Sequence, residues 1–203
     1  MSYLKRVEIR AENWDEMVKH FETRTQMHID LVKKYIRKIL DLNLPQVNNL
    51  ALLQELDHDT GKFEEPERNP YVYIAWKYYQ QKLGNEYEIP EEIQQKTTEA
   101  TFHHITTHKH HPEYWDDTVT IQCLNTQDRD KPAVEMVDAT SMPLTYVASM
   151  MADWLAMSEE KNTDVNDWIK MNVNIRWKFT LQQVSLMKTI ASKISVERIG
   201  SKF

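Results

Sequence analysis

The chain has 203 residues, a length that fits one domain, and 41% of them are hydrophobic, which excludes an intrinsically disordered chain. The formal net charge of −6 argues against a nucleic-acid polymer as the main partner, because binding to a phosphate backbone needs a basic surface. Only three glycines are present, which favours helices over an all-β fold with many tight turns. We therefore predict an all-α chain that folds as a single domain over residues 1–203.

The cysteine content and the N-terminal sequence bear on the cellular compartment. Cys123 is the only cysteine, so no disulfide can form within the chain and a reducing compartment is expected. The first residues, MSYLKRVEIRAENWDEM, lack the apolar segment of a signal peptide, and no stretch approaches 18 apolar residues. These features predict a cytoplasmic protein with no membrane partner.

The first half of the chain has the spacing of amphipathic helices. In residues 27–40, His28 shares one stripe with apolar residues such as Val32. Residues 47–59 and 71–84 have the same spacing and are predicted to be the second and third helices.

The fourth predicted helix, over residues 89–111, holds a concentration of histidines. Pro90 suits its first turn, and Pro112 disfavours the α conformation at the residue before it, so the helix is expected to end there. Five of the eight histidines lie in HHITTHKHH, residues 103–111. On a helix they form two stripes about 100° apart, one with His104, His108 and His111 and the other with His103 and His110.

The second half of the chain adds an irregular stretch and further helices. The sequence VTIQCL, residues 119–124, is interpreted as irregular. A helix is predicted over residues 141–157, with Pro143 near its start. Residues 164–196 are predicted to form one or two helices that pack on the preceding ones or on a second subunit. A homo-oligomer is therefore one possible assembly.

The pentapeptide HDTGK places two types of metal ligand side by side at a predicted helix end. His58 supplies an imidazole nitrogen, and Asp59 supplies a hard oxygen that can bridge two cations. Gly61 is expected to let the backbone turn sharply behind them, and Lys62 then comes within reach of an anion held by the metals. This combination indicates metal chemistry more strongly than a histidine–aspartate pair alone.

Three further residues are candidates of lower specificity. His28 is either a core histidine with a hydrogen-bond partner or a ligand. Asp153 lies in the middle of an apolar helix, a position that does not suit capping, and a buried carboxylate needs an ion pair or a metal. Asp138 is the rival acidic residue, but it lies near a helix start, where a capping or surface role is the better interpretation.

The order of these residues, H…HD…H…HH…D, resembles the HD-domain superfamily of metal-dependent phosphohydrolases. HDTGK is similar to the HD-x-G-K variant of its cyclic-dinucleotide and dinucleoside-polyphosphate hydrolases. A closer resemblance is to HD-like phage and bacterial proteins with HD-x-x-K-F and H-x-x-x-N-x-H-H-P-E-Y-W motifs, followed by M-P and D-W. The matching elements are HDTGKF at 58–63, HITTHKHHPEYW at 104–115, MP at 142–143 and DW at 153–154. His108 replaces the asparagine of that pattern, which favours a rim position over a ligand role.

The resemblance implies a helical bundle of the HD-domain type with a metal site in its core. That core would span about residues 25–160, with the helices of 164–196 packed on it. One divalent cation (Mn, Fe, Zn, Co or Mg) would be held by His28, His58, Asp59 and Asp153. Asp59 would bridge to a second cation held by His104 and by His110 or His111; we favour His110, with His111 contacting the substrate.

The activity implied by the resemblance is hydrolysis of a nucleotide or another small phosphoester or phosphoanhydride by a metal-activated water. Asp59, Lys62 and Glu113 would be catalytic, with Lys62 also clamping a phosphate and Glu113 moving a proton. Trp115 and Arg68 would contact the substrate. The alternatives are a surface salt bridge for Glu113, packing for Trp115 and a solvated position for Arg68. At the level of function, the alternatives are a di-iron oxygenase of HD fold and a non-catalytic nucleotide- or metal-binding module.

Overall fold

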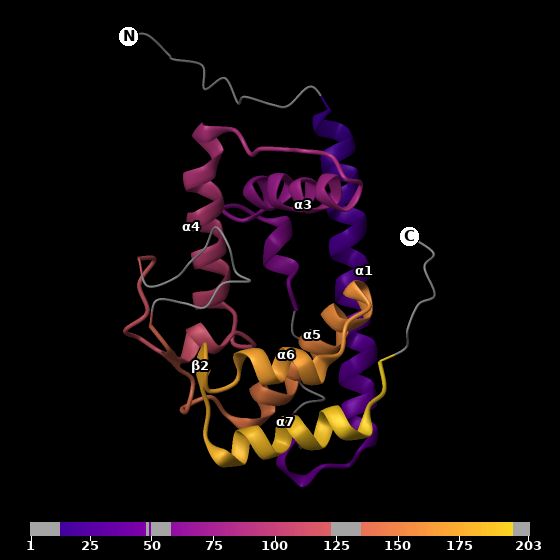
Figure 1. Ribbon diagram of the computed structural model, residues 1–203, viewed down its shortest axis with the longest axis vertical. Helices are drawn as coiled ribbons and strands as arrows, with labels where there is room; N and C mark the ends of the chain where they lie inside the picture. Colours follow the sequence, from indigo (N-terminus) through magenta and orange to yellow (C-terminus); the bar gives the residue numbers. More distant parts are fainter. Residues whose placement is uncertain (1–12, 48, 50–57, 123–134, 197–203) are drawn as a thin grey trace.

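The computed structural model describes residues 13–47, 49, 58–122 and 135–196, and this part of the chain is mostly helical (Figure 1). The predicted all-α class is therefore confirmed at this level. The helices are α1 (Trp14–Asp41), α3 (Arg68–Lys82), α4 (Glu91–Thr107), α5 (Leu144–Lys161), α6 (Val165–Asn172) and α7 (Leu181–Lys193). The short 3-10 turns are η1 (Pro45–Val47), η2 (Thr60–Phe63) and η3 (Pro112–Trp115), and two-residue strands β1 (Val137–Asp138) and β2 (Trp177–Lys178) pair in parallel.

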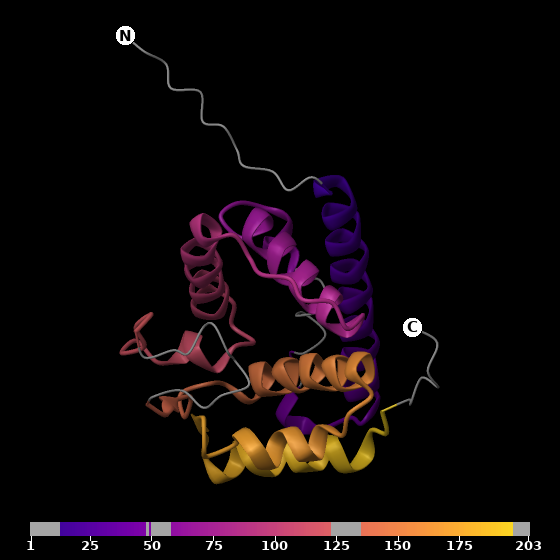
Figure 2. The same ribbon diagram turned by 45° about the horizontal axis from the view of Figure 1, so that its top comes forward.

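Helix α1 is the long element along which the other helices are arranged. It has 28 residues and begins at Trp14, well before the predicted start at residue 27. Figures 1 and 2 show α3 and α4 at one end of the molecule and α5, α6 and α7 at the other, with α1 running beside both groups. One helix therefore contributes side chains to both ends.

Two apolar clusters divide the buried residues. The smaller one joins the first turns of α1 to α3 and includes Met17, Phe21, Val72, Tyr73 and Trp76. The larger one joins the second half of α1 to α5 and α7 and includes Val32, Ile36, Met150, Leu155, Met187 and Ile190. Because α7 contributes fully buried side chains to this cluster, it packs on α1 and α5. His28 lies on α1 between the two clusters and is itself buried.

Most predicted helices are present with shifted ends. The helix predicted over 71–84 is α3, and the one predicted over 141–157 is α5, which starts directly after Pro143. Residues 164–196 form α6 and α7, with β2 between them. The helix predicted over 47–59 falls almost wholly outside the described residues. Of VTIQCL, residues 119–122 have no regular secondary structure, as predicted, and the last two residues lie outside the described part.

The prediction that the fourth helix runs to residue 111 is wrong, because α4 ends at Thr107. His108 is extended, with φ −100° and ψ 121°, and its own Nδ1–H donates to the His104 carbonyl at 2.8 Å. The backbone N–H of His108 donates to the same carbonyl at 3.1 Å, so the side-chain bond adds to the last hydrogen bond of the helix and holds His108 at its C-terminal end. The preceding Ile-Thr-Thr run also has a low helix propensity. His110 and His111 therefore lie in a turn, and the two helical stripes predicted for the five histidines do not form.

The two short strands fix the chain on either side of α5. Val137 pairs with Trp177 and Asp138 with Lys178, so the segment before α5 is held against the segment before α7. Gln183 strengthens this junction, because its buried amide donates to the carbonyls of Ala139 and Met142 at 3.0 and 2.7 Å. Gln183 also occupies the N3 position of the capping box at the start of α7, in which Thr180 is the N-cap.

Replacing Thr180 with alanine is expected to lower the free energy of unfolding by about 1 kcal/mol, because the hydroxyl that accepts from the Gln183 backbone N–H is lost. Urea denaturation followed by circular dichroism measures the change. Ser192→Ala, at an exposed position of the same helix, is the control and should change stability by less than about 0.5 kcal/mol. Equal effects for the two variants would contradict the capping role.

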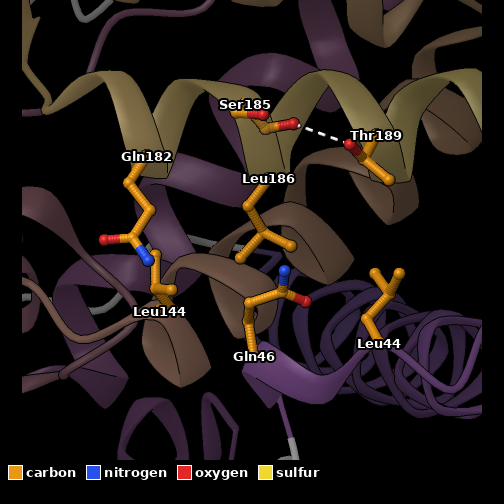
Figure 3. Close-up of a pocket in the computed structure, with 7 residues that line it drawn as sticks. All are labelled: Leu44, Gln46, Leu144, Gln182, Ser185, Leu186 and Thr189. Carbon is orange, nitrogen blue, oxygen red and sulfur yellow. Dashed lines mark hydrogen bonds between the residues drawn. The ribbon is translucent and has the colours of Figure 1, made fainter.

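A hollow lies at the end of the molecule that holds α7. Figure 3 shows its lining, in which Leu44 and Gln46 from the η1 region face the start of α5 and one side of α7, and the full set is Leu44, Gln46, Leu144, Gln182, Ser185, Leu186 and Thr189. None of these residues is a predicted site residue, so the hollow is separate from the histidines. Among the described helices, none combines the length and the apolar character needed to cross a membrane.

Candidate metal centre

Asp59 and Asp153 lie among histidine rings contributed by distant parts of the chain. His28 Nε2 of α1 lies 3.0 Å from Asp153 Oδ1 of α5 and 3.5 Å from Asp59 Oδ2. His58 Nε2 lies 3.8 Å from each of the same two oxygens. His28, His58 and Asp153 therefore present ligand atoms within 4.8 Å of one another, as a metal ion requires. The fold brings together all four residues predicted for the first metal.

A second group of histidines approaches the other oxygen of Asp59. His104 Nε2 lies 3.2 Å and His110 Nε2 lies 3.7 Å from Asp59 Oδ1. The His111 ring lies 4.8 Å from the His104 ring and 4.2 Å from the His110 ring, measured between centroids. The ligand atoms of the three histidines lie within 4.8 Å of one another. Both candidates that the sequence left open, His110 and His111, are thus next to His104.

The backbone at Asp59 explains how one carboxylate reaches both groups. Asp59 has φ 60° and ψ 7°, in the left-handed region that aspartate tolerates better than most residues. The sharp turn predicted at Gly61 is therefore made by Asp59, and this part of the prediction is wrong. Gly61 instead allows a close approach, because a Cβ there would lie 3.0 Å from His108 Nε2, which is tighter than an ordinary contact.

The buried polar atoms of the cluster fit a metal ion. His58 Nε2 and Asp59 Oδ1 are buried and have no hydrogen-bond partner among the described residues. Such atoms are rare in folded proteins, because each one costs free energy of about 1–3 kcal/mol when left unsatisfied. Both are donor atoms for metals, and a set of imidazole nitrogens and carboxylate oxygens suits Mn²⁺, Fe²⁺, Co²⁺ or Zn²⁺ better than Mg²⁺. The buried cluster could therefore hold a metal ion.

Two glutamates that the sequence analysis missed stand behind the cluster. His28 Nδ1–H donates to Glu160 Oε1 at 2.6 Å, and His104 Nδ1–H donates to Glu67 Oε2 at 2.9 Å. Glu160 follows Asp153 by two helical turns on α5, so helical periodicity could have identified it. Glu67 follows an irregular loop and directly precedes α3, where no periodicity points to it.

Burial and the mutual interactions of the cluster shift several pKa values. Burial raises the pKa of Asp59, but Lys62, His58 and His104 outweigh it and hold that pKa well below its usual range. The pKa of Asp153 is also well below its usual range, because His28 and His58 outweigh burial. Burial and the neighbouring His58 lower the pKa of His110 far below that of free histidine, so His110 is neutral and able to bind a metal.

His28 behaves in the opposite way. Burial lowers its pKa, but hydrogen bonds to Asp153 and Glu160 outweigh burial and raise the pKa to about 9. The metal-free fold is therefore stabilised by protonated His28 below pH 6.5, and this contribution is lost as the pH rises through about 9.

Metal binding at His28 is expected to release one proton between pH 6.5 and about 9, because the imidazole must be neutral to bind a cation. The apparent affinity for Zn²⁺ should rise about tenfold per pH unit in this range. Calorimetric titration in buffers of different ionisation enthalpy measures the proton release. His28→Gln serves as the control, and a pH dependence equal to that of the wild type in this variant would contradict the assignment.

Two of the predicted substrate contacts have partners that define their positions. Lys62 Nζ bonds to Asp59 Oδ2 at 2.5 Å and lies 5.2 Å from the centroid of the Tyr71 ring. Lys62 is thus part of the cluster, as its spacing predicted. Arg68 is the first residue of α3 instead of a loop residue, and it pairs with Glu22 of α1 at 2.9 Å. Its role as a phosphate contact stays a prediction.

The remaining candidates lie near β2 and α5. Glu113 is buried, and its Oε1 accepts from the Trp177 indole at 2.8 Å. Trp115 packs its ring on Tyr146 and donates to the Lys109 carbonyl, which agrees with the packing alternative. The Asp138 side chain is 43% exposed and bonds to Lys178, so the surface interpretation of this rival carboxylate is confirmed.

His103 and His108 occupy the edge of the cluster. The His103 side chain is 45% exposed and donates from Nδ1 to Glu67 at 2.8 Å. His108 packs its ring 4.3 Å from that of His104 and could share a cation with His104 and Glu67. Of the five histidines in residues 103–111, His104 and His110 face Asp59, His108 and His111 pack near the His104 ring, and His103 is exposed.

Comparison with known proteins places the chain in one family. The model of the family described as "Family of unknown function (DUF5662)" matches residues 17–193, which include every candidate ligand. No curated protein and no solved structure matches the chain.

Proposed function

We propose that this chain, which belongs to this family of unknown function, is a metal-dependent phosphohydrolase of the HD-domain type. Its substrate would be a nucleotide or another small phosphoester or phosphoanhydride. The observation that supports the proposal best is the position of Asp59, whose two carboxylate oxygens face different histidine groups. A carboxylate between two groups of imidazole nitrogens is what a bridged pair of divalent cations needs.

Each group of side chains would hold one cation. His28, His58 and Asp153 would hold the first with Asp59 Oδ2, and His104 and His110 would hold the second with Asp59 Oδ1. When bound, divalent cations would lower the pKa of a water molecule towards neutrality and balance the charge of phosphoryl oxygens. His111 stays at the edge of the second group, where it can contact substrate or act as a further ligand.

Lys62 is the residue that we propose as the phosphate clamp. Its ammonium group is mostly buried, with 14% of the side chain exposed, and it lies against Asp59 and the Tyr71 ring. A cation held at this position can bond to a phosphoryl oxygen beside the metals. Glu113 has one carboxylate oxygen, Oε2, with no hydrogen-bond partner among the described residues, which leaves it able to take or give a proton.

The proposal is tested by purifying the chain without chelator, measuring its metals, and assaying nucleotides, cyclic dinucleotides and simple phosphoesters. We expect phosphate release that does not depend on oxygen. Lys62→Met should lower kcat/KM by about tenfold to a hundredfold, through the loss of one charge-assisted bond to the substrate of about 1.5–3 kcal/mol. Lys178→Met, which removes a surface ammonium paired with Asp138, is the matched control and should have the activity of the wild type.

Two results would overturn the proposal in different directions. An oxygen-dependent product formed by an iron-loaded chain would assign it to the di-iron oxygenases. Saturable binding of a nucleotide without any product would assign it to the binding modules.

A further inference from the structure

Two glutamates make the same kind of hydrogen bond to histidines of the cluster, on the side of the ring that faces away from Asp59 and Asp153. Glu160 accepts from Nδ1 of His28 at 2.6 Å, and Glu67 accepts from Nδ1 of His104 at 2.9 Å. In both rings the other nitrogen, Nε2, faces a carboxylate of the candidate centre, at 3.0 Å from Asp153 for His28 and 3.2 Å from Asp59 for His104. Each of the two histidine groups therefore contains one ring with an outer carboxylate.

We infer that Glu67 and Glu160 are positioning residues for the metal ions. Each would fix its histidine in the Nδ1–H tautomer and in one ring orientation, so that the Nε2 lone pair points at the cation. This inference rests on the metal binding in the proposed function, but not on the identity of the substrate. It assigns one such residue to each of the two cations.

The bonds made by the two glutamates favour an outer role over direct ligation. Glu67 is 1% exposed, and its second oxygen accepts from His103 Nδ1 at 2.8 Å. The second oxygen of Glu160 pairs with Arg24 at 3.0 Å. Both oxygens of each carboxylate are thus already engaged. In the group formed by Glu67, His104 and His108, we therefore assign Glu67 to orienting His104 and not to binding the cation.

The chain offers a matched control for these residues. Glu159 precedes Glu160 on α5, is 5% exposed, and accepts hydrogen bonds from Lys34 and the Tyr35 hydroxyl. It is therefore a buried and fully bonded glutamate on the same helix, but its hydrogen-bond partners among the described residues include no histidine of the centre. Loss of its charge perturbs the fold without touching a candidate ligand.

The experiment compares Glu67→Gln and Glu160→Gln with Glu159→Gln in the full chain. Zn²⁺ affinity is measured by competition with a chromogenic chelator, and the Kd is expected to rise by about 10- to 100-fold in the first two variants. Nuclear magnetic resonance of the Zn²⁺-loaded chain gives a second readout. The Nδ1 protons of His28 and His104 should exchange slowly in the wild type and in Glu159→Gln. In each positioning variant, the proton on the affected ring should exchange rapidly.

The outcomes separate this inference from the proposed function. If both variants bind Zn²⁺ as tightly as Glu159→Gln, the inference is overturned and the phosphohydrolase proposal is unaffected. If the wild type binds Zn²⁺ but hydrolyses no phosphoester, the proposed function fails, and the affinities still decide the inference. If the wild type binds no Zn²⁺, the inference is overturned as well. Should Glu67→Gln fail to fold, Glu160→Gln decides the question, because its side chain is partly exposed.

Discussion

Replacing Asp59 with asparagine is expected to abolish metal binding by the purified chain and to lower the proposed phosphohydrolase activity by about a thousandfold or more. Both histidine groups depend on this carboxylate, since its two oxygens face His28 and His104 respectively. The loss of several kcal/mol of transition-state stabilisation by metal ions corresponds to at least this factor. Asparagine is the appropriate substitution because it tolerates the left-handed backbone at φ 60°, whereas alanine would add strain. Elemental analysis and steady-state kinetics measure the two effects.

The control for this variant is Asp138→Asn, which changes the rival carboxylate on the surface. The pKa of Asp138 is lowered to about 2 by its hydrogen bond with Lys178, and the residue lies outside the cluster. It should keep its metal and its activity. Full metal content and activity in Asp59→Asn would show that the centre lies elsewhere. Circular dichroism of the metal-free variant is needed as well, because Lys62 and the histidines lose a buried counter-charge.

Removing metal from the wild-type chain is expected to lower its Tm by about 10 °C. At a free metal concentration of about a thousand times Kd, binding to the folded state alone contributes about 4 kcal/mol. A domain of this size shifts by about 2–4 °C for each kcal/mol. Thermal denaturation with added Zn²⁺ or Mn²⁺, and again after chelation, measures the effect. We expect Mg²⁺ to give a smaller shift, because the donors include several imidazole nitrogens.

The same melting experiment on Asp59→Asn shows whether the shift comes from this centre. The variant should have a Tm that does not change with metal. A wild-type Tm that is the same with and without transition metals would contradict binding at the cluster. An equal shift in the variant would assign the stabilisation to another site.

Local patterns in the sequence marked several of these residues as candidates, and the resemblance to the HD-domain superfamily implied the full ligand set. His28 and Asp153 stand out as polar residues on apolar helical stripes, and both are brought to Asp59 by the packing of α1 against α5. The pair His58-Asp59 is a weak signal alone and gains specificity from the Gly61 and Lys62 that follow it. These signals do not depend on where helices end, so shifted ends did not affect them.

Features that depend on tertiary contacts or on exact backbone geometry could not be predicted in this way. The α4 helix ends at a cap in which the backbone N–H and the side chain of His108 both bond to the His104 carbonyl, and the Pro112 signal does not record this local contact. The sequence predicts a sharp turn at Gly61, because glycine is the most permissive residue, yet it is Asp59 that adopts the left-handed conformation. Glu67 and His104 are 37 positions apart in the sequence, and helical periodicity cannot predict a contact between them.

The arrangement of the centre has a consequence for how the protein matures. His28 and its partner Glu160 are 132 positions apart in sequence, and the other members come from the segment before η2, from α4 and from the turn after it. Closing such long loops is slow compared with forming a helix. The full set of metal-binding atoms is therefore assembled only when nearly the whole chain has folded. Metal uptake during refolding should follow the gain of helix and should report the last step of assembly.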